Sequence, residues 1–350
     1  MKLLILTQIV DKTDAALGFF HQWIEAFSKH CESVIVICLY EGEHDFPSNV
    51  RVLSLGKEKG YSRWAYIRSF YSYIYKEKAN YDAVFVHMNQ IYILLGGLLW
   101  KVWKKPVSLW YAHKSVTRSL RLASYITQHI FTSTENSFRI QTSKKRVIGH
   151  GIDTNLFAPQ KEKKNNIFTI LSVGRITRIK DYESLIAAVN LLKEKKYISK
   201  TNLWGGTATP DDAVYLNDLH RELQEKELET DITLCGPALH SNEPQILSTA
   251  HVFAHMSKTG SLDKTVLEAM AVGIPIVSCN ESVAEIIPES LYDICMFREG
   301  DIKDFSEKIE TFYHMTQEKR DQVGKELRDV VVRRHNLSKL VATIIKTLTV

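Results

Sequence analysis

The sequence predicts an α/β protein with two doubly wound parallel-sheet domains in tandem. Apolar runs of strand length alternate with helical patterns almost from end to end of the 350 residues. Runs that are apolar throughout, separated by helices, are typical of parallel strands covered on both faces. The segment FAPQKEKKNNIFT at 157–169 interrupts this alternation with a proline, a charge cluster and two asparagines, which are features of a linker.

Four segments are expected along the chain. Residues 1–156 form the first domain, 157–169 the linker, 170–334 the second domain, and 335–350 a helical C-terminal segment that packs back toward the first domain. Ligands of doubly wound sheets bind beyond the carboxyl ends of the strands. With two sheets, the natural site is the cleft between them.

The clearest helix is expected at 19–30, where Phe20, Trp23, Ile24 and Phe27 recur at the spacing of one helix face. Further helices are expected near 181–195, near 211–227, around Glu268 and from 301 onward. The expected strands are 2–8, 33–40, 50–55, 82–88, 106–113, 129–134 and 145–151 in the first half, and 168–174, 201–206, 231–236, 251–257 and 274–279 in the second.

The composition is that of an ordinary soluble globular protein, with a mildly basic net charge of +5. This charge suits an anionic small ligand or an anionic membrane surface, and is too weak to indicate nucleic acid. The apolar stretch that opens the chain is too short for a signal peptide, and the segment 91–103 is too short to span a bilayer. The cysteines form no CxxC pair and are expected to be buried free thiols in a reducing cytoplasm: Cys31, Cys38, Cys235, Cys279 and Cys295.

Three cations follow a predicted strand end in SVGRITRIKDYESL at 172–185. The strand ends at Gly174, and Arg175, Arg178 and Lys180 precede a helix that begins near residue 181. Cations at a helix N-terminus favour a polyanion, because the helix dipole and the free backbone N–H groups favour the same charge. The alternative is a solvated basic loop, and the pattern alone leaves both open.

One carboxylate, that of Glu268, stands inside the apolar stretch at 265–272. Residues three or four apart share a helix face, so no face near Glu268 is clearly solvated, and an unpaired buried charge is costly. The carboxylate could be kept for a ligand hydroxyl. Alternatively, Glu268 is stabilised near a helix N-terminus by the dipole or by one lysine.

Three histidines, His87, His113 and His150, follow strands in the first half, where α/β sites form. A lone histidine is nevertheless more often structural. The sequence has no HxxH, HExxH or paired Asp-x-Asp motif, so a tightly held metal is not expected. It also lacks GxGxxG in the first strand-to-helix turn, a GxSxG elbow and a Walker A loop, which counts against a dinucleotide-binding oxidoreductase.

Aromatic and basic residues crowd two stretches, YSRWAYIRSFYSYIYKEK at 61–78 and LLWKVWKKP at 98–106. On exposed helix faces these residues would suit a membrane interface. The alternative is a pair of ordinary amphipathic helices that cover a sheet.

With these stretches in view, the chain resembles the family 4 glycosyltransferases, whose GT-B fold has two Rossmann-like domains facing across a cleft. The strongest match is TVLEAMAVGIPIVS at 265–278, which is similar to the family's Glu-Ala-Met-Ala helix, Gly-x-Pro turn and valine-rich strand. The segment 172–186 resembles the family's Val-Gly-Arg segment with its following lysine. The segment GHGIDTNLFAP at 149–159 resembles the one that closes the first domain.

The resemblance implies that a sugar moves from a nucleotide-diphosphate donor to a hydroxyl acceptor with retention of configuration and without a metal or other cofactor. The first domain would be the acceptor side, and the second would bind the nucleotide sugar. The acceptor would be a glycan or lipid-linked, in surface-glycan or glycolipid synthesis. The expected location is the cytoplasm, with peripheral attachment to the inner face of the membrane left open.

The same resemblance implies roles for individual residues. Arg175 and Lys180 would hold the donor diphosphate during catalysis, and His113 would lie near the donor sugar and the acceptor. Glu268 would accept hydrogen bonds from the ribose, so its partner would be the ligand and not another side chain. The other expected donor-binding positions are Gly18, Gly260, Ser261, Leu262 and Thr265.

The chain departs from the family pattern at three places. Gly260 stands where the family usually has a glutamate that faces the donor sugar, and Glu281 and Ser282 replace a glycine pair. The glycine pair of the first domain is also missing, which leaves Gly18 as the nearest candidate. Two alternatives therefore stay open: a nucleotide-sugar-binding protein without turnover, suggested by Gly260, and a GT-B-type sugar-nucleotide epimerase.

Overall fold

The computed structural model describes residues 1–14, 17–160, 166–258 and 261–349. The chain folds into two compact units. Unit 1 comprises Met1–Asp153 and His335–Val350, and unit 2 comprises Thr154–Arg334. Phe157, at the start of the segment expected to be a linker, is buried, and a strand begins at Phe168 before that segment ends.

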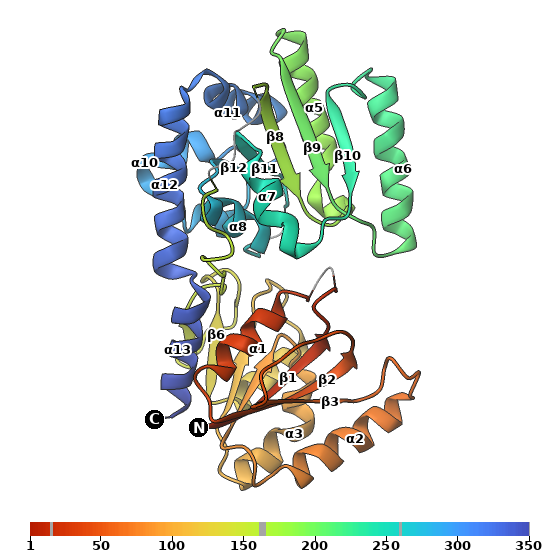
Figure 1. The fold of residues 1–350 in the computed structure, drawn as a ribbon, viewed down its shortest axis with the longest axis vertical. Helices are drawn as coiled ribbons and strands as arrows, with labels where there is room; N and C mark the ends of the chain where they lie inside the picture. Colours follow the sequence, from red (N-terminus) through yellow and green to blue (C-terminus); the bar gives the residue numbers. More distant parts are fainter. Residues whose placement is uncertain (15–16, 161–165, 259–260, 350) are drawn as a thin grey trace. The chain divides into compact units, whose positions relative to one another are not determined.

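Unit 1 is built on a seven-stranded sheet with the order β3-β2-β1-β4-β5-β6-β7, in which every pair of neighbours is parallel (Figure 1). The central strands are apolar on both faces because helices cover both. The strands are β1 (Lys2–Val10), β2 (Ser33–Glu41), β3 (Val50–Ser54), β4 (Ala83–His87), β5 (Val107–Trp110), β6 (His129–Thr132) and β7 (Lys145–Val147).

The helices of unit 1 divide between the two faces of its sheet. Helices α1 and α13 pack on one core cluster, and α2, α3 and α4 pack on the other. Side-chain caps begin three of these helices, since Ser62, Thr117 and Asn336 each accept a backbone N–H from the first turn. The helices are α1 (Phe20–Ser28), α2 (Arg63–Lys76), α3 (Ile91–Val102), α4 (Arg118–Ile126) and α13 (Leu337–Leu348).

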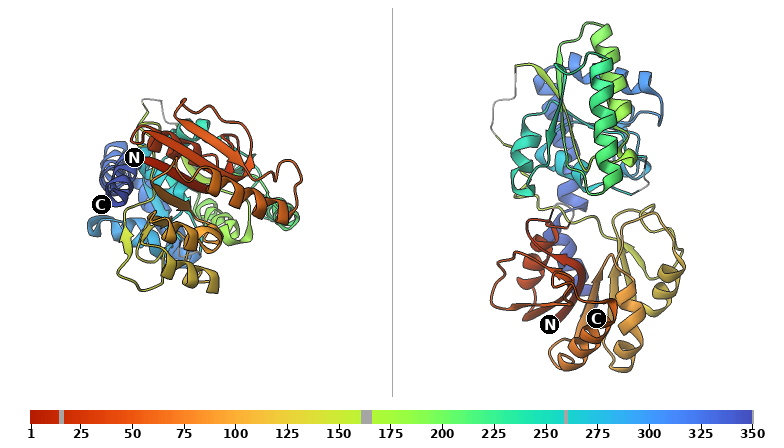
Figure 2. Two further views of the ribbon diagram at one scale, coloured as in Figure 1. Left: turned by 90° about the horizontal axis from the view of Figure 1, so that it is seen from below. Right: turned by 90° about the vertical axis from the view of Figure 1, so that its right-hand side faces the viewer.

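Unit 2 is built on a five-stranded parallel sheet with the order β10-β9-β8-β11-β12. Figure 2 allows the helices to be followed around each sheet from two further directions. The strands are β8 (Phe168–Val173), β9 (Ser199–Trp204), β10 (Ile232–Gly236), β11 (Val252–His255) and β12 (Ile276–Ser278). The helices are η1 (Arg178–Lys180), α5 (Tyr182–Glu194), α6 (Pro210–Glu225), η2 (His240–Asn242), α7 (Glu243–Ser248), α8 (Lys264–Val272), α9 (Glu281–Ala284), α10 (Glu289–Cys295), α11 (Ile302–His314) and α12 (Gln317–Arg334).

The predicted fold class of two doubly wound parallel sheets is confirmed. The helices expected at 19–30, 181–195 and 211–227 appear as α1, α5 and α6 with ends shifted by one or two residues. None of the helices formed by the described residues has the length and apolar character needed to cross a bilayer. All five cysteines are free, but only three are buried, because Cys235 and Cys279 lie at strand ends and are partly exposed.

The parallel strands of unit 2 bring three loops together at one edge of the sheet, the edge formed by the carboxyl ends of the strands. Strands β8, β11 and β12 are neighbours, and they end at Val173, His255 and Ser278. Because parallel strands share the edge at which they end, the segments that follow them lie side by side there. This edge holds the residues of the candidate site.

The C-terminal helix should be essential to the stability of unit 1. Leu340 of α13 is buried against the same core as α1, so Leu340→Ala should lower the free energy of unfolding of unit 1 by about 3 kcal/mol in urea titrations. Leu98→Ala on α3 is the control, because that leucine is 69% exposed, and its loss should change the free energy by less than about 0.5 kcal/mol. Equal effects of the two variants would contradict this role for α13.

Candidate functional site

Glu268 lies on α8 with only 2% of its side chain exposed, and it already has a side-chain partner. Its carboxylate forms an ion pair with Lys264, one helical turn earlier. The expectation that its partner is a ligand and not another side chain is therefore wrong. The i, i+4 spacing places the ammonium of Lys264 on the same helix face, which is the single-lysine alternative that the pattern left open.

The carboxylate of Glu268 belongs to a larger charged cluster. His240 Nδ1 lies 2.8 Å from Glu243 Oε2 and 3.8 Å from Glu268 Oε1, and Lys264 Nζ lies 3.3 Å from His240 Nε2. Burial raises the pKa values of Glu243 and Glu268, although the charge of Lys264 opposes both shifts. The cluster thus has two carboxylates and one ammonium, and it favours groups that donate hydrogen bonds.

The ligand atoms of His240, Glu243 and Glu268 lie within 4.8 Å of one another, a spacing at which three residues can share a metal ion. The ammonium of Lys264 lies among these atoms and supplies positive charge to them. His240 and Glu243 were not predicted from the sequence, because they precede Glu268 by 28 and 25 residues and match no motif.

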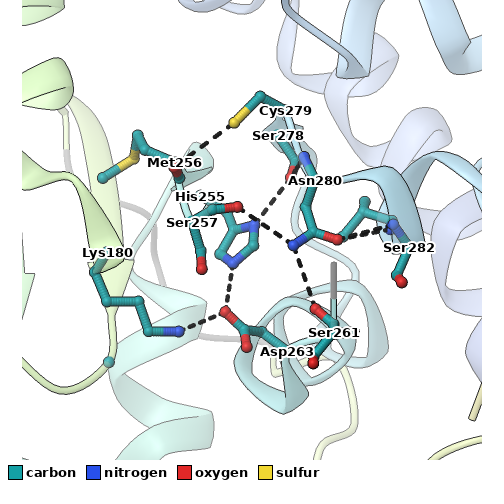
Figure 3. Close-up of polar contacts among 12 residues, drawn as sticks. Lys180, His255, Met256, Ser257, Ser261, Asp263, Ser278, Cys279, Asn280 and Ser282 are labelled. Atoms are coloured by element: carbon teal, nitrogen blue, oxygen red, sulfur yellow. Dashed lines mark hydrogen bonds and ion pairs between the residues drawn. The ribbon is translucent and has the colours of Figure 1, made fainter. Parts of the chain in front are cut away.

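A second network joins the loops after β8, β11 and β12, as Figure 3 shows. Lys180 forms an ion pair with Asp263 Oδ2, and the same oxygen accepts a hydrogen bond from His255 Nε2 at 2.7 Å. His255 Nδ1 lies 2.9 Å from Ser278 Oγ, which also accepts the backbone N–H of Asn280. This pattern assigns the ring proton of His255 to Nε2 and leaves Nδ1 to accept the Ser278 hydroxyl.

The protonation states of Asp263 and His255 near neutral pH follow from their surroundings. Burial raises the pKa of the Asp263 carboxyl, but the charge of Lys180 and the hydrogen bond from His255 outweigh burial and hold it well below its usual range. Burial lowers the pKa of His255 more than Asp263 raises it. Asp263 is therefore an anion, Lys180 a cation and His255 neutral.

The other two cations of the loop after β8 differ in their surroundings. Arg178 forms an ion pair with Asp218 at 2.6 Å and lies over the ring of Tyr215. Arg175 is exposed, and within the described parts of the chain it has no hydrogen bond or ion pair. The guanidinium of Arg175 is therefore the one of this pair that is available to a ligand.

The remaining predicted positions of unit 2 surround the start of α8. The carbonyl of Ser261 accepts a hydrogen bond from Asn280 at 3.2 Å, Leu262 is buried, and Thr265 lies in the first helical turn. Gly260 lies outside the described residues. Asp263 immediately precedes α8 but makes no capping hydrogen bond with it.

The predicted residues of unit 1 have ordinary structural environments. A Cβ atom on Gly18 would lie 2.6 Å from the carbonyl oxygen of Asp14, so close packing in the turn before α1 requires glycine there. His113 is exposed, its Nδ1 accepts the backbone N–H of Ser115, and burial together with Lys114 lowers its pKa. His87 is stacked on Phe20 in the core, and burial lowers its pKa to about 3, as expected of a structural histidine.

A cavity of about 380 Å³ opens beside the Glu268 cluster, at the carboxyl ends of β9 and β10. Its walls come from the end of β9 and from the segment that contains His240 and Glu243. They are mostly apolar, and they are formed by Trp204, Pro237, Ala238, Leu239, Asn242, Gln245 and Ile246.

Removal of Lys264 should leave a buried charge without its main partner. Lys264→Met should lower the free energy of unfolding of unit 2 by about 3 kcal/mol at pH 8. The pKa of Glu268 is already raised in the folded state and should rise further in this variant. The folded state then binds a proton more tightly than the unfolded state, so the loss should shrink as the pH falls toward 5.

The control for this prediction is Lys303→Met. Lys303 also pairs with a glutamate four residues later, but both side chains are exposed, so the change should stay within about 0.5 kcal/mol at every pH. Urea titrations at pH 5, 6.5 and 8 measure both variants. A loss for Lys264→Met that is small or independent of pH would contradict this account of Glu268.

Comparison with known sequences now identifies the family. A family model described as "Glycosyl transferases group 1" matches residues 153–330, which is more than half of the chain. One component of the human phosphatidylinositol N-acetylglucosaminyltransferase is 25% identical over 202 residues, which are 57% of this chain and 40% of that protein. The alpha-monoglucosyldiacylglycerol synthase of Streptococcus pneumoniae is 25% identical over 174 residues, 45% of this chain and 38% of that protein. The chain thus spans two-fifths or less of the length of these relatives.

Solved structures share the fold over nearly the whole chain. HepE of Anabaena in complex with UDP has a TM-score of 0.81 at 17% identity and covers 100% of both chains. The sucrose-phosphate synthase of Thermosynechococcus elongatus has a TM-score of 0.81 at 16% identity and covers 99% of this chain and 98% of that one. At such identities the similarity establishes the fold, and it confirms the predicted GT-B architecture. Together with the match over 153–330, it shows that the chain belongs to the group 1 glycosyl transferases.

Proposed function

We propose that the chain is a retaining glycosyltransferase that moves a sugar from a nucleotide-diphosphate sugar to a hydroxyl acceptor. One observation carries the proposal: three features that suit such a donor meet at one edge of the sheet in unit 2. These are the cations Arg175 and Lys180, the carboxylate cluster around Glu268, and the apolar cavity beside that cluster. The complex of HepE with UDP, which has the same fold, supports the proposal.

Each part of a nucleotide sugar has a group to receive it. The carboxylates of Glu243 and Glu268 would accept hydrogen bonds from the ribose hydroxyls, and Lys264 would keep them partly neutralised. The apolar cavity would take the base, with the side-chain amides of Asn242 and Gln245 as hydrogen-bonding groups. The family resemblance assigned the ribose to Glu268, and the cluster adds Glu243 and His240 to that site.

The cations would act on the leaving group. Negative charge grows on the diphosphate as the glycosidic bond breaks, and Arg175 and Lys180 would stabilise it together with the N–H groups that open α8. His113, neutral at pH 7, would lie near the donor sugar and the acceptor, as the resemblance implies. No resident metal is proposed, because Lys264 supplies the positive charge among the three potential metal ligands.

The proposed acceptor is a glycan or a lipid-linked hydroxyl, at an anionic membrane surface. Two relatives carry lipids in their names, phosphatidylinositol in one and diacylglycerol in the other. On unit 1, aromatic and apolar side chains are exposed on α2, α3 and α4, which cover one face of the sheet and carry lysines and arginines nearby. These exposed side chains are Trp64, Tyr71, Tyr75, Ile91, Leu98, Val102, Leu122 and Tyr125.

A second candidate is a protein that binds a nucleotide sugar without turnover. The ion pair between Lys180 and Asp263 favours it, because one of the two proposed phosphate ligands already has an anionic partner. Release of nucleoside diphosphate only when an acceptor is present distinguishes the transferase from this binder. It also distinguishes the transferase from a sugar-nucleotide epimerase, which would convert its substrate without an acceptor.

The donor site is tested by thermal stabilisation with UDP-glucose, GDP-mannose and ADP-glucose, since a ligand of the folded state raises the melting temperature. One of these donors should stabilise the chain, and Arg175→Ala should weaken its binding by roughly tenfold or more, the equivalent of one charge-assisted hydrogen bond. Excess EDTA should leave this binding and sugar transfer unchanged. Arg221→Ala is the control, because Arg221 is an exposed arginine of α6 paired with Asp218. Lack of binding by the wild-type chain, or equal affinity of Arg175→Ala and wild type, would sink the assignment.

Attachment to membranes is tested by co-sedimentation with vesicles of phosphatidylglycerol and phosphatidylcholine. The chain should bind at low ionic strength and dissociate as salt rises, and Trp64→Ser with Tyr75→Ser should reduce binding severalfold. Tyr292→Ser, an exposed tyrosine of unit 2, should have no effect. If the wild-type chain stays in the supernatant at low salt, the membrane proposal fails.

A further inference from the structure

Lys180 does not face the proposed diphosphate site as a free cation. Its ammonium is bound to the carboxylate of Asp263, and about a fifth of each side chain is exposed, so a ligand can still approach the pair. Lys180 and Asp263 are 83 residues apart in the sequence, and they meet because β8 and β11 are neighbours.

The position of Asp263 indicates a role beyond helix formation. Aspartate directly before a helix usually accepts a hydrogen bond from the first turn, which stabilises the helix. Asp263 makes no such bond with α8, and its Oδ2 accepts instead from Lys180 and from His255 Nε2. The carboxylate is thus directed toward Lys180 in the loop after β8.

His255 keeps this carboxylate in place without neutralising it. His255 is 4% exposed and is fixed on its other side by Ser278, which is fully buried and accepts the backbone N–H of Asn280 (Figure 3). A neutral imidazole donates one hydrogen bond and adds no positive charge. Among the described residues, the charged group that contacts Asp263 is Lys180, and the residue after Lys180, Asp181, forms a separate ion pair with Lys258.

We propose that Asp263 is a specificity-determining residue of the donor site, where its fixed negative charge disfavours the free nucleoside diphosphate more than the nucleotide sugar. The inference rests on the proposed function. In the nucleotide sugar, the terminal phosphate is esterified to the sugar and has one ionisable oxygen fewer than in the free diphosphate. The product diphosphate therefore carries more negative charge on its terminal phosphate, the end proposed to lie near Asp263. A fixed anion therefore repels the product more strongly than the donor and speeds its release.

The test compares the two ligands by calorimetric titration of wild type and Asp263→Asn. The pairs are UDP with UDP-glucose, GDP with GDP-mannose, and ADP with ADP-glucose. For the pair that binds, Asp263→Asn should bind the diphosphate about tenfold more tightly and the sugar donor by a smaller factor, so the ratio of the two dissociation constants shifts toward the diphosphate. Asp263→Ser, which keeps a helix-capping residue before α8, should shift the ratio in the same direction.

The control is Asp231→Asn, which removes a carboxylate from another lysine–aspartate pair, at the opposite edge of the same sheet. Its two dissociation constants should stay within about twofold of wild type, as expected for a charge far from the bound ligand and screened by salt. If the Asp263 variants fold and bind both ligands with unchanged or uniformly weakened affinity, Asp263 is only structural and the inference is overturned. If wild type binds none of the three pairs, the proposed function fails and this inference falls with it.

Discussion

The arrangement of unit 2 depends on ion pairs between charged side chains that are largely buried at the ends of its strands. Lys180 and Asp263 carry opposite charges, and each needs the other because a buried charge without a partner is costly. The neutral His255 adds a hydrogen bond to the carboxylate of Asp263. Their bonds tie together the loops that follow β8, β11 and β12. The same requirement therefore positions α8, whose first turn begins at the residue after Asp263.

Glu268 satisfies the same requirement in a different way. Its partner Lys264 lies on its own helix, and Glu243 and His240 approach from α7 and the turn before it. Burial raises the pKa values of both glutamates and so disfavours their ionised forms, while the charge of Lys264 opposes this effect. Hydrogen bonds donated by ligand hydroxyls would also favour the ionised forms. Under the proposed function, the Glu268 cluster would receive hydroxyl groups of the ligand, and the network around Lys180 would receive its phosphates.

Much of the fold was predictable because a buried parallel strand is apolar throughout and is followed by a helix, and both patterns are local. Arg175, Lys180 and Glu268 stand out in the sequence because they follow a strand end or lie inside an apolar helix, where charge is unexpected, and their roles toward a ligand stay predictions. Asp263 was not recognised, because its role depends on a contact across 83 residues. The prediction that a ligand, and not a side chain, is the partner of Glu268 was wrong for a related reason. Only the structure shows that the side chain of Lys264 turns inward toward Glu268.

The most direct test of this account is a crystal structure of the chain with the nucleoside diphosphate that binds it. We expect phosphate oxygens within hydrogen-bond distance of Arg175 and Lys180, and ribose hydroxyls on the carboxylate of Glu268. We also expect that the ammonium of Lys180 has turned from Asp263 toward the phosphate or bridges the two. A nucleotide bound elsewhere, or one that leaves Arg175 and Lys180 without phosphate contacts, would contradict it.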